Sequence, residues 1–243
     1  NRGYEPLRGQ TLEPGQPPDL KEGFYIGQEI AQDDERVKIK KFNHGPNQWP
    51  SELPQFQPVM SEYYSIMLEL ARAMMSGIAL SLNLKESYFE SFCVEELATL
   101  RLLHYPPQLA NPRPGEKGCG AHTDFGTITL LMQDDCGGLQ LWIEGEGWVH
   151  AEPQPDTYLV NLGDMMARWT NDRYRSTRHR VVNMSGRERY SVPFFYLGNP
   201  DYPVKCISSC LDKGQTPKYD ETTVEKHYQD MYKATYAPGS ITS

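Results

Sequence analysis

Two side chains that could bind a metal lie two positions apart in the segment Gly120–Gly126. They are His122 and Asp124, and an apolar run from Thr127 to Met132 follows. Side chains two positions apart in an extended segment point to the same face, so an imidazole and a carboxylate would converge there. A third ligand of suitable type is His179. Two imidazoles and one carboxylate form a facial triad that holds a ferrous ion and leaves three coordination positions open for chemistry.

A second pair of residues with suitable chemistry follows ten positions after His179. Arg189 and Ser191 share one face of a predicted strand, because side chains two positions apart point the same way. A guanidinium binds a carboxylate through two parallel charge-assisted hydrogen bonds, and a neighbouring hydroxyl can donate another. The pair therefore predicts a site for an anionic small molecule.

In their order and spacing, these motifs resemble a known family. His122-x-Asp124, then His179 followed by Arg-Val-Val, then Arg189-x-Ser191 is similar to the Fe(II)/2-oxoglutarate oxygenases of the isopenicillin N synthase-like branch. Among its members, the chain most resembles fungal ones such as thymine 7-hydroxylase. The resemblance implies one Fe(II) held by the two histidines and the aspartate.

The resemblance covers about residues 100–200 and also implies a co-substrate site. It implies that 2-oxoglutarate takes two of the open positions on the iron and that O2 takes the last. Arg189 would pair with the distal carboxylate of 2-oxoglutarate, Ser191 would donate a hydrogen bond to it, and Tyr105 could supply another donor. Leu103 stands where many plant relatives have Asn, so the binding set differs there in detail.

The reaction implied by the resemblance is oxidation, by default hydroxylation, of a C–H bond in a small molecule, with release of succinate and carbon dioxide. Desaturation, ring closure and ring expansion remain open, and fungal secondary metabolism is a suitable setting. Two other classes also remain open. An oxidase of the isopenicillin N synthase kind shares the motifs but does not use 2-oxoglutarate, and a non-catalytic jelly-roll binding protein would be expected to have lost a ligand.

Three residues are predicted to contact the substrate, together with loop residues from the first fifty. Phe125 directly follows the His-x-Asp pair, Phe195 lies four positions beyond Ser191, and Arg101 begins the strand that carries Tyr105. Two aromatic rings and a guanidinium suit a flat or carboxylate-bearing molecule. The alternative to substrate contact is a structural role: either phenylalanine ring could pack in the hydrophobic core, and Arg101 could form an ion pair with an acidic residue.

The spacing of apolar residues predicts one long helix and a β-rich core. Residues such as Val59 and Ile66 recur at helical spacing from Pro58 to Leu82, and a shorter helix is expected over Ser87–Phe92. Short runs separated by turn residues then predict a mainly β fold with flanking helices, a jelly roll that this family calls a double-stranded β-helix. The expected strands are Leu100–Tyr105, Thr127–Met132, Leu139–Ile143, Trp148–Ala151, Thr157–Leu162, Met165–Trp169, Thr177–Asn183 and Tyr190–Leu197. Gly137-Gly138 is expected to form a hairpin between two of them.

The length of 243 residues suits a single oxygenase domain. Because the chain begins at Asn1 in a segment that resembles the family after its first helix and strand, a natural N-terminal segment is expected to be missing. The C-terminal helix is predicted over Thr222–Tyr232, with Ala237–Ser240 as tail. The expected parts are an irregular region 1–56, a helical region 58–92, a jelly-roll core 98–200, and a C-terminal helix and tail 201–243.

The composition excludes some classes of partner and predicts the cellular compartment. A net charge of −8 argues against nucleic acid and anionic membrane surfaces, and no apolar run is long enough to span a bilayer. The five cysteines lack paired zinc spacing, which predicts free thiols in a reducing compartment, the cytoplasm. Cys119 and His122 could form a nucleophilic pair, but the histidine is better explained as a ligand. Of the other histidines, His104 is expected nearest the pocket, and the oligomeric state is left open.

Overall fold

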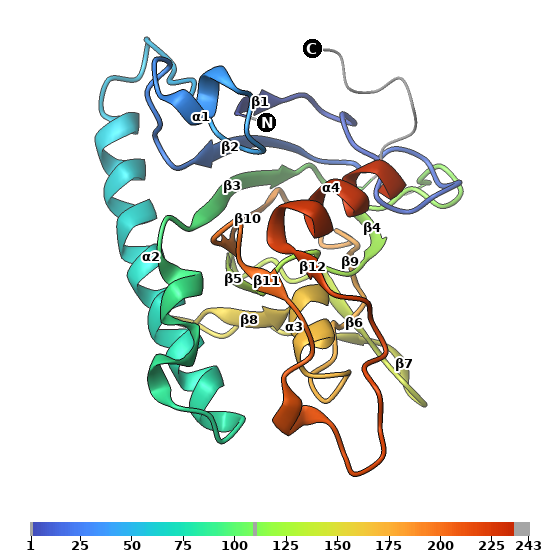
Figure 1. Cartoon of the computed structure of the whole chain (residues 1–243). Coiled ribbons are helices and arrows are strands. Elements are labelled where there is room, and N and C mark those ends of the chain that lie inside the picture. Colours follow the sequence, from blue (N-terminus) through green and yellow to red (C-terminus); the bar gives the residue numbers. More distant parts are fainter. Residues whose placement is uncertain (1, 109–110, 236–243) are drawn as a thin grey trace.

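The computed structural model describes residues 2–108 and 111–235, which form two β-sheets and several helices (Figure 1). The strands of the larger sheet are β1 (Gly3–Glu5), β2 (Glu22–Gly27), β3 (Leu97–Tyr105), β5 (Ile128–Gln133), β8 (Leu159–Leu162) and β10 (Arg189–Gly198). Those of the smaller sheet are β4 (Cys119–His122), β6 (Leu139–Ile143), β7 (Gly147–His150) and β9 (His179–Val181). A two-stranded ribbon joins β11 (Pro203–Val204) and β12 (Thr222–Thr223). The helices are α1 (Glu35–Lys38), α2 (Phe56–Ser81), α3 (Asp164–Trp169) and α4 (Val224–Thr235), with 3-10 turns η1 (Glu86–Cys93) and η2 (Ser208–Cys210).

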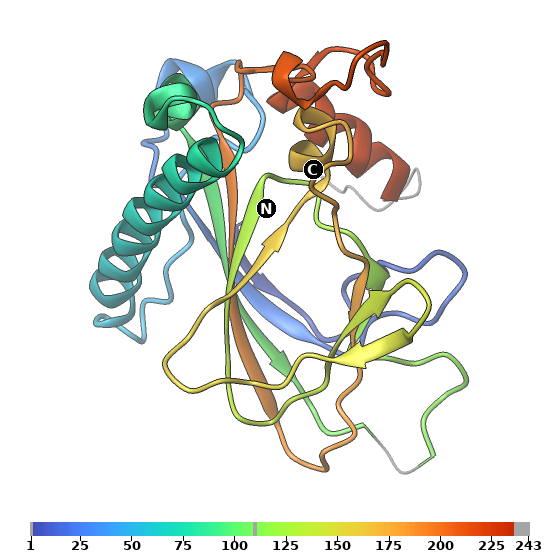
Figure 2. The same cartoon turned by 90° about the horizontal axis from the view of Figure 1, so that it is seen from below.

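The two sheets face each other, as Figure 2 shows. The larger sheet has the order β1-β2-β3-β10-β5-β8 and the smaller one β4-β9-β6-β7, with antiparallel pairing throughout. Leu103 and Tyr105 of one sheet pack against Cys119, Leu139 and Val181 of the other. This is the jelly roll predicted from the sequence.

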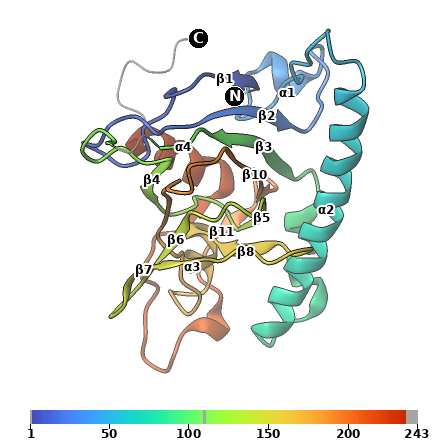
Figure 3. The same ribbon diagram turned by 180° about the vertical axis from the view of Figure 1, so that it is seen from behind.

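The long helix α2 covers the outer face of the larger sheet (Figure 3). Its buried side chains include Met67, Ala71 and Met75, which are fully buried in the main core. The hydroxyl of Tyr64 donates a hydrogen bond to the carbonyl of Ala98 at 3.0 Å. Flexible Met and small Ala side chains fill the irregular space above the strands.

The buried stripe of α2 is shifted from the predicted one. Val59 and Ile66 were expected inside, but their side chains are 54% and 55% exposed. Two neighbouring stripes of this helix both have helical spacing, so periodicity alone could not choose between them. The stripe that packs against the sheet is the one with the smaller and more flexible side chains, such as Met67, Ala71 and Met75.

One predicted strand is wrong, because Met165–Trp169 forms most of helix α3. Met165, Met166 and Trp169 are all buried. A short, continuous apolar run can be a buried strand or a buried helix, and its periodicity does not distinguish them. The other predicted strands occur, with ends that differ by a few residues.

The N-terminal region was expected to be irregular, but it supplies two strands of the larger sheet. β1 pairs with β2, and β2 pairs with β3 so that Tyr25 lies opposite Arg101. Residues 9–20 lack a regular element. They are nevertheless tied to β4, because Asp19 accepts a hydrogen bond from the Gly120 amide at 2.8 Å and Glu13 accepts one from Ala121 at 3.0 Å.

The expected hairpin at Gly137-Gly138 is also wrong. These residues connect β5 to β6, which belong to different sheets. Both have a positive φ, of 76° and 90°, which favours glycine. A Cβ on Gly138 would lie 2.8 Å from the carbonyl oxygen of Val182, so the crossover needs glycine for a second reason. The predicted C-terminal helix corresponds to α4, and the predicted tail lies outside the described residues.

The start of α3 is docked on the loop that follows β4. The amides of Gly163, Asp164 and Met165 donate to the carbonyls of Thr127, Asp124 and Gly126, at 2.9, 2.8 and 3.1 Å. These are amides that the first turn of a helix leaves without partners of its own. A Cβ on Gly163 would press against Gly126 O and lie 2.8 Å from Asp124 O, so this close approach requires glycine.

None of the helices within residues 2–108 and 111–235 is both long enough and apolar enough to cross a membrane.

We expect Gly163→Ala to destabilise the fold by about 3 kcal/mol, because the new methyl group meets backbone atoms that cannot move aside. Thermal unfolding measures the effect. Gly77→Ala is the matched control: Gly77 lies on the exposed side of α2 with open space around it, and alanine there should stabilise by roughly 0.5 kcal/mol. Equal melting temperatures for the two variants would contradict the docking of α3.

Candidate metal centre and active site

Three side chains of ligand type converge at the end of β4 and the start of β9. His122 and His179 lie opposite each other in the β4–β9 pairing. Their Nε2 atoms lie 3.8 and 3.6 Å from Oδ1 of Asp124. The ligand atoms of all three residues lie within 4.8 Å of one another, and no other such group of His, Cys, Asp or Glu occurs in the described part of the chain.

Asp124 reaches this point from a loop and not from a strand. His122 and Asp124 were predicted to share the face of one extended segment, but β4 ends at His122. The loop is held by its own backbone. Besides the three carbonyls that α3 binds, the carbonyl of Phe125 accepts a hydrogen bond from Nε2 of His227 on α4 at 2.8 Å. Anchoring by two helices therefore replaces strand alternation as the cause of the convergence.

Both histidines present an Nε2 lone pair to the centre. Nδ1 of His122 donates to Gly120 O at 2.8 Å, and Nδ1 of His179 donates to Thr177 O at 3.0 Å. A carbonyl only accepts, so the proton is on Nδ1 in each ring. Burial lowers the pKa of both imidazoles, and the neighbouring His122 lowers that of His179 further. Neutral imidazoles oriented by backbone carbonyls are the form that binds metal.

The carboxylate of Asp124 has one oxygen engaged and one oxygen facing the histidines. Oδ2 accepts hydrogen bonds from Thr129 Oγ1 and Asn161 Nδ2, both at 2.7 Å. Burial by itself raises the pKa of this carboxyl, but the two imidazoles and these hydrogen bonds outweigh it, so the pKa is lowered. An ionised carboxylate with two neutral imidazoles suits a ferrous ion.

Arg189 is a buried cation without an acidic partner. Its side chain is 1% exposed, Nε donates to Gly137 O at 2.6 Å, and one terminal nitrogen donates to Gln133 Oε1 at 3.1 Å. Among residues 2–108 and 111–235, no carboxylate lies within 4 Å of its guanidinium. A buried charge is costly unless it is paired, so this site calls for an anion from outside the chain.

Ser191 and Tyr105 lie beside the guanidinium of Arg189. Arg189 and Ser191 share the inner face of β10, as strand alternation predicted, and both are buried. The guanidinium carbon lies 4.8 Å from the centre of the Tyr105 ring. Burial raises the pKa of Tyr105, whose hydroxyl is hydrogen bonded to Ser191 and stays protonated as a donor. Leu103 lies opposite Ser191 on β3 and offers no donor.

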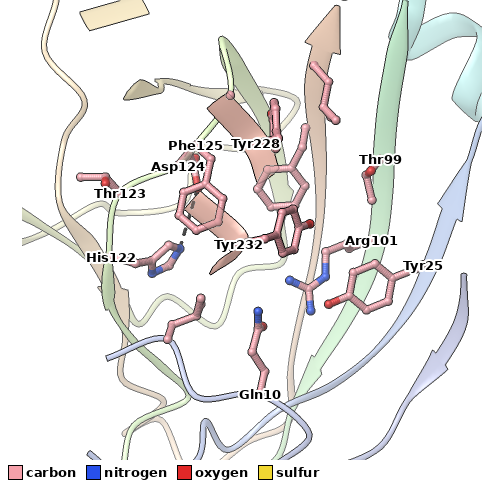
Figure 4. A pocket seen from close by; sticks show the side chains of 14 residues that line it. Gln10, Tyr25, Thr99, Arg101, His122, Thr123, Asp124, Phe125, Tyr228 and Tyr232 are labelled. Atoms are coloured by element: carbon pink, nitrogen blue, oxygen red, sulfur yellow. Dashed lines mark ion pairs between the residues drawn. The ribbon is translucent and has the colours of Figure 1, made fainter. Parts of the chain in front are cut away.

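A cavity opens beside the three converging side chains. His122 and Asp124 line it together with the three predicted substrate residues, Arg101, Phe125 and Phe195 (Figure 4). His179 and the residues of the anion site do not line it. A concave site lined by aromatic side chains and a few polar groups suits a small molecule. The structure thus separates this cavity from the buried Arg189 in the interior.

The cavity includes residues that were not predicted individually. Gln10 belongs to the loops of the first fifty residues, which were expected here as a group, whereas Tyr25 lies on β2, and Tyr228 and Tyr232 come from α4. Arg101 also has the acidic partner that the sequence argument considered, but this partner is Glu5, which was not named. No local signal marks these residues, because they reach the cavity only through tertiary packing.

Thr129, Gln133 and Asn161 were also missed as supporting residues. A signal was available for the first two: they are polar residues on the inner face of the otherwise apolar β5. His104 does not approach the cavity. It lies on the other face of β3, between Glu22 and Glu188.

Cys119 is not poised as a nucleophile. Its Sγ lies 3.9 Å from Nδ1 of His122, but burial raises the pKa of the thiol to about 11. The reactive form of cysteine is the thiolate, which is scarce at neutral pH under these conditions.

Comparison with known proteins gives a consistent result. Residues 97–198 match the 2OG-Fe(II) oxygenase superfamily, and residues 1–52 match the N-terminal region described as non-haem dioxygenase in morphine synthesis. The 2-oxoglutarate-Fe(II) type oxidoreductase hxnY of Emericella nidulans is 48% identical over 244 residues, covering 97% of this chain and 69% of that protein. The 2-oxoglutarate-dependent dioxygenase citB of Monascus ruber is 42% identical, covering 97% and 73%.

A similar solved structure is that of a full-length Neurospora crassa protein in complex with alpha-KG and thymine. Its TM-score is 0.83 at 33% identity, covering 97% of this chain and 75% of that chain. This chain belongs to the 2OG-Fe(II) oxygenase superfamily. It is an Fe(II)- and 2-oxoglutarate-dependent oxidoreductase, and its predicted resemblance to fungal members is confirmed.

We expect Asp124→Ala to lower iron affinity at least about 100-fold and to abolish turnover, because the ion loses its one anionic protein ligand. Titration of the protein with Fe(II) under anaerobic conditions measures the affinity. Asp135→Ala, at an exposed acid, is the control and should bind iron as the unaltered protein does. Unchanged iron binding by Asp124→Ala would refute the assignment of the triad.

Proposed function

We propose that this protein is a non-haem dioxygenase that hydroxylates a C–H bond of a small molecule held in the cavity. In this proposal His122, Asp124 and His179 bind Fe(II), and Arg189, Ser191 and Tyr105 bind 2-oxoglutarate. Arg101, Phe125 and Phe195 contact the substrate. Similarity to fungal dioxygenases such as citB supports a role in fungal secondary metabolism.

The observation that carries the proposal is the buried guanidinium of Arg189. A triad alone could serve many reactions, but a cation with no acid of its own within the described residues requires an anionic co-substrate. The planar fork of Arg189 matches a carboxylate, and the hydroxyls of Ser191 and Tyr105 can donate to it. The names of the relatives identify 2-oxoglutarate as the anion used in related proteins.

The residues of this chain position the reactants and keep their charge states fixed. Bound Fe(II), with 2-oxoglutarate and O2, supplies the oxidising power to break a C–H bond, and succinate and carbon dioxide are the by-products. Asn161 and Thr129 hold the Asp124 carboxylate so that one oxygen stays free for the ion. Phe125 and Phe195 line the cavity, and in this proposal their rings pack against the substrate and reduce the access of water to it.

The proposal is tested by screening mixtures of metabolites for Fe(II)- and 2-oxoglutarate-dependent release of succinate. Oxygen consumption with and without 2-oxoglutarate distinguishes the dioxygenase from an isopenicillin N synthase-type oxidase. Iron titration distinguishes both from a non-catalytic binding protein. Oxygen uptake that needs no 2-oxoglutarate would overturn the proposal.

We also propose that the protein works in the cytoplasm. The support is chemical: all five cysteines are free thiols, as expected in a reducing compartment.

We expect Arg189→Lys to weaken 2-oxoglutarate binding about tenfold or more while iron binding persists, because lysine keeps the charge but loses the two-pronged hydrogen bonding. The apparent affinity for 2-oxoglutarate in succinate release is the measurement. Arg187→Lys, two positions away at the surface, is the control. An unchanged 2-oxoglutarate dependence in Arg189→Lys would favour the oxidase.

We expect Phe125→Ala and Arg101→Gln to uncouple the two half-reactions once a substrate is known. Substrate oxidation should fall severalfold further than succinate release, because a loosely held substrate is missed while 2-oxoglutarate is still consumed. Both products are assayed in one reaction. A parallel loss of both, with a lower melting temperature, would show that these side chains serve packing instead.

A further inference from the structure

The first three strands bring a cation, an anion and a phenol together at one side of the cavity. Arg101 on β3 donates to Glu5 Oε2 on β1 at 2.7 Å. The hydroxyl of Tyr25 on β2 donates to the other oxygen, Glu5 Oε1, at 3.0 Å. The Tyr25 ring also lies under the guanidinium, with 4.2 Å from its centre to the guanidinium carbon. The side chains of Arg101 and Glu5 are only 10% and 15% exposed.

The charge of Arg101 is therefore already compensated by the protein. A carboxylate at hydrogen-bond distance in a poorly hydrated site cancels most of the attraction that the guanidinium would exert on a second anion. The Arg101 side chain lines the cavity and makes one hydrogen bond to a described residue, the one to Glu5, so further N–H groups of the guanidinium can donate to a ligand. Its Nε is buried without an acceptor among these residues, and because an unsatisfied buried N–H is costly, a ligand oxygen or ring nitrogen beside the guanidinium would be stabilising.

The two buried arginines thus differ in the kind of ligand group that would stabilise them. Arg189 has backbone and amide acceptors but no acid in the described part of the chain, so it requires an anion. Arg101 has Glu5, so it requires only an acceptor. Arg101 is also the one Lys or Arg among the described residues that line the cavity. A substrate carboxylate would therefore meet a cation whose charge is already balanced.

The shape of the cavity adds a second requirement. Phe125, Phe195, Tyr228 and Tyr232 line it, and the rings of Phe125 and Tyr232 meet edge to face at 5.9 Å. Arg101 lies across the cavity from His122, with Tyr232 between them in the view of Figure 4. Aromatic walls favour a flat ring over a flexible chain.

We propose that the substrate is an uncharged, flat ring compound whose carbonyl oxygen or equivalent neutral acceptor binds Arg101, and that Glu5 rejects carboxylate analogues. Specificity of this kind comes from repulsion as well as attraction. The inference rests on the proposed function, because the cavity serves as a substrate site only if the neighbouring triad binds iron.

The test compares matched ring compounds that differ in charge. The protein is loaded with Fe(II) and 2-oxoglutarate without oxygen, and benzamide, benzoate, salicylamide and salicylate are titrated against the visible absorbance of the complex. We expect each amide to bind at least about tenfold more tightly than its acid, a difference of roughly 1.4 kcal/mol. Glu5→Gln should remove or reverse this preference, because the charge of Arg101 then becomes available to the acid.

Two further variants distinguish an effect of the Arg101 charge from a general loss of structure. The double variant Glu5→Gln/Arg101→Gln should gain no affinity for the acids, since the gain requires the guanidinium. Glu22→Gln removes an acid from the outer face of β2, where Glu22 contacts Tyr4 and His104, and should leave the preference unchanged. Thermal unfolding of each variant reports on its folding.

Three results would overturn the inference: acids that bind the unaltered protein as tightly as amides, no binding by either amide, or a Glu5→Gln variant with the original preference. The first two are measured on the unaltered protein, so they can overturn the proposal even if the variants fold poorly. Failure of the proposed function is recognisable separately, because the Fe(II) and 2-oxoglutarate complex would not form at all. That result would overturn both proposals.

Discussion

Four successive backbone carbonyls, from Asp124 to Thr127, hold the Asp124 side chain beside His122 and His179. Three accept hydrogen bonds from the first amides of α3, and the fourth accepts one from His227 on α4. A loop with every carbonyl paired has little freedom to move, so the Asp124 carboxylate meets the two imidazoles without support from a strand. The triad, the cavity beside it and the packing of both helices therefore depend on the same short segment.

The sequence was sufficient to predict which side chains come together, but not which contacts support them. Residue types and strand alternation are local properties, and the structure brings His122, Asp124 and His179 together and places Arg189 and Ser191 on one face of β10. The sequence could not show that Met165–Trp169 is helical and not a strand. The helix depends on its docking against the carbonyl of Asp124, which is a tertiary contact. Likewise, nothing near Arg101 in the chain indicates its pairing with a glutamate almost a hundred residues away.

Arg101 and Arg189 show that residue type does not fix the role of a buried side chain. Both are buried arginines on adjacent strands, and residue type alone predicts the same role for both. Their partners make the two roles different. The guanidinium of Arg101 faces a glutamate, whereas that of Arg189 faces only neutral acceptors among the described residues. Function at such positions is set by the local balance of charge, which exists only after β1, β3 and β10 have assembled.

The hydrogen bonds from residues 9–20 to β4 have a consequence beyond the site. β4 is an edge strand of the smaller sheet, and an edge strand normally offers free amides to which a strand of another molecule can add. Here the amides of Gly120 and Ala121 are occupied by the carboxylates of Asp19 and Glu13. By occupying these amides, the two acidic side chains protect the strand that carries His122 from intermolecular β-sheet formation.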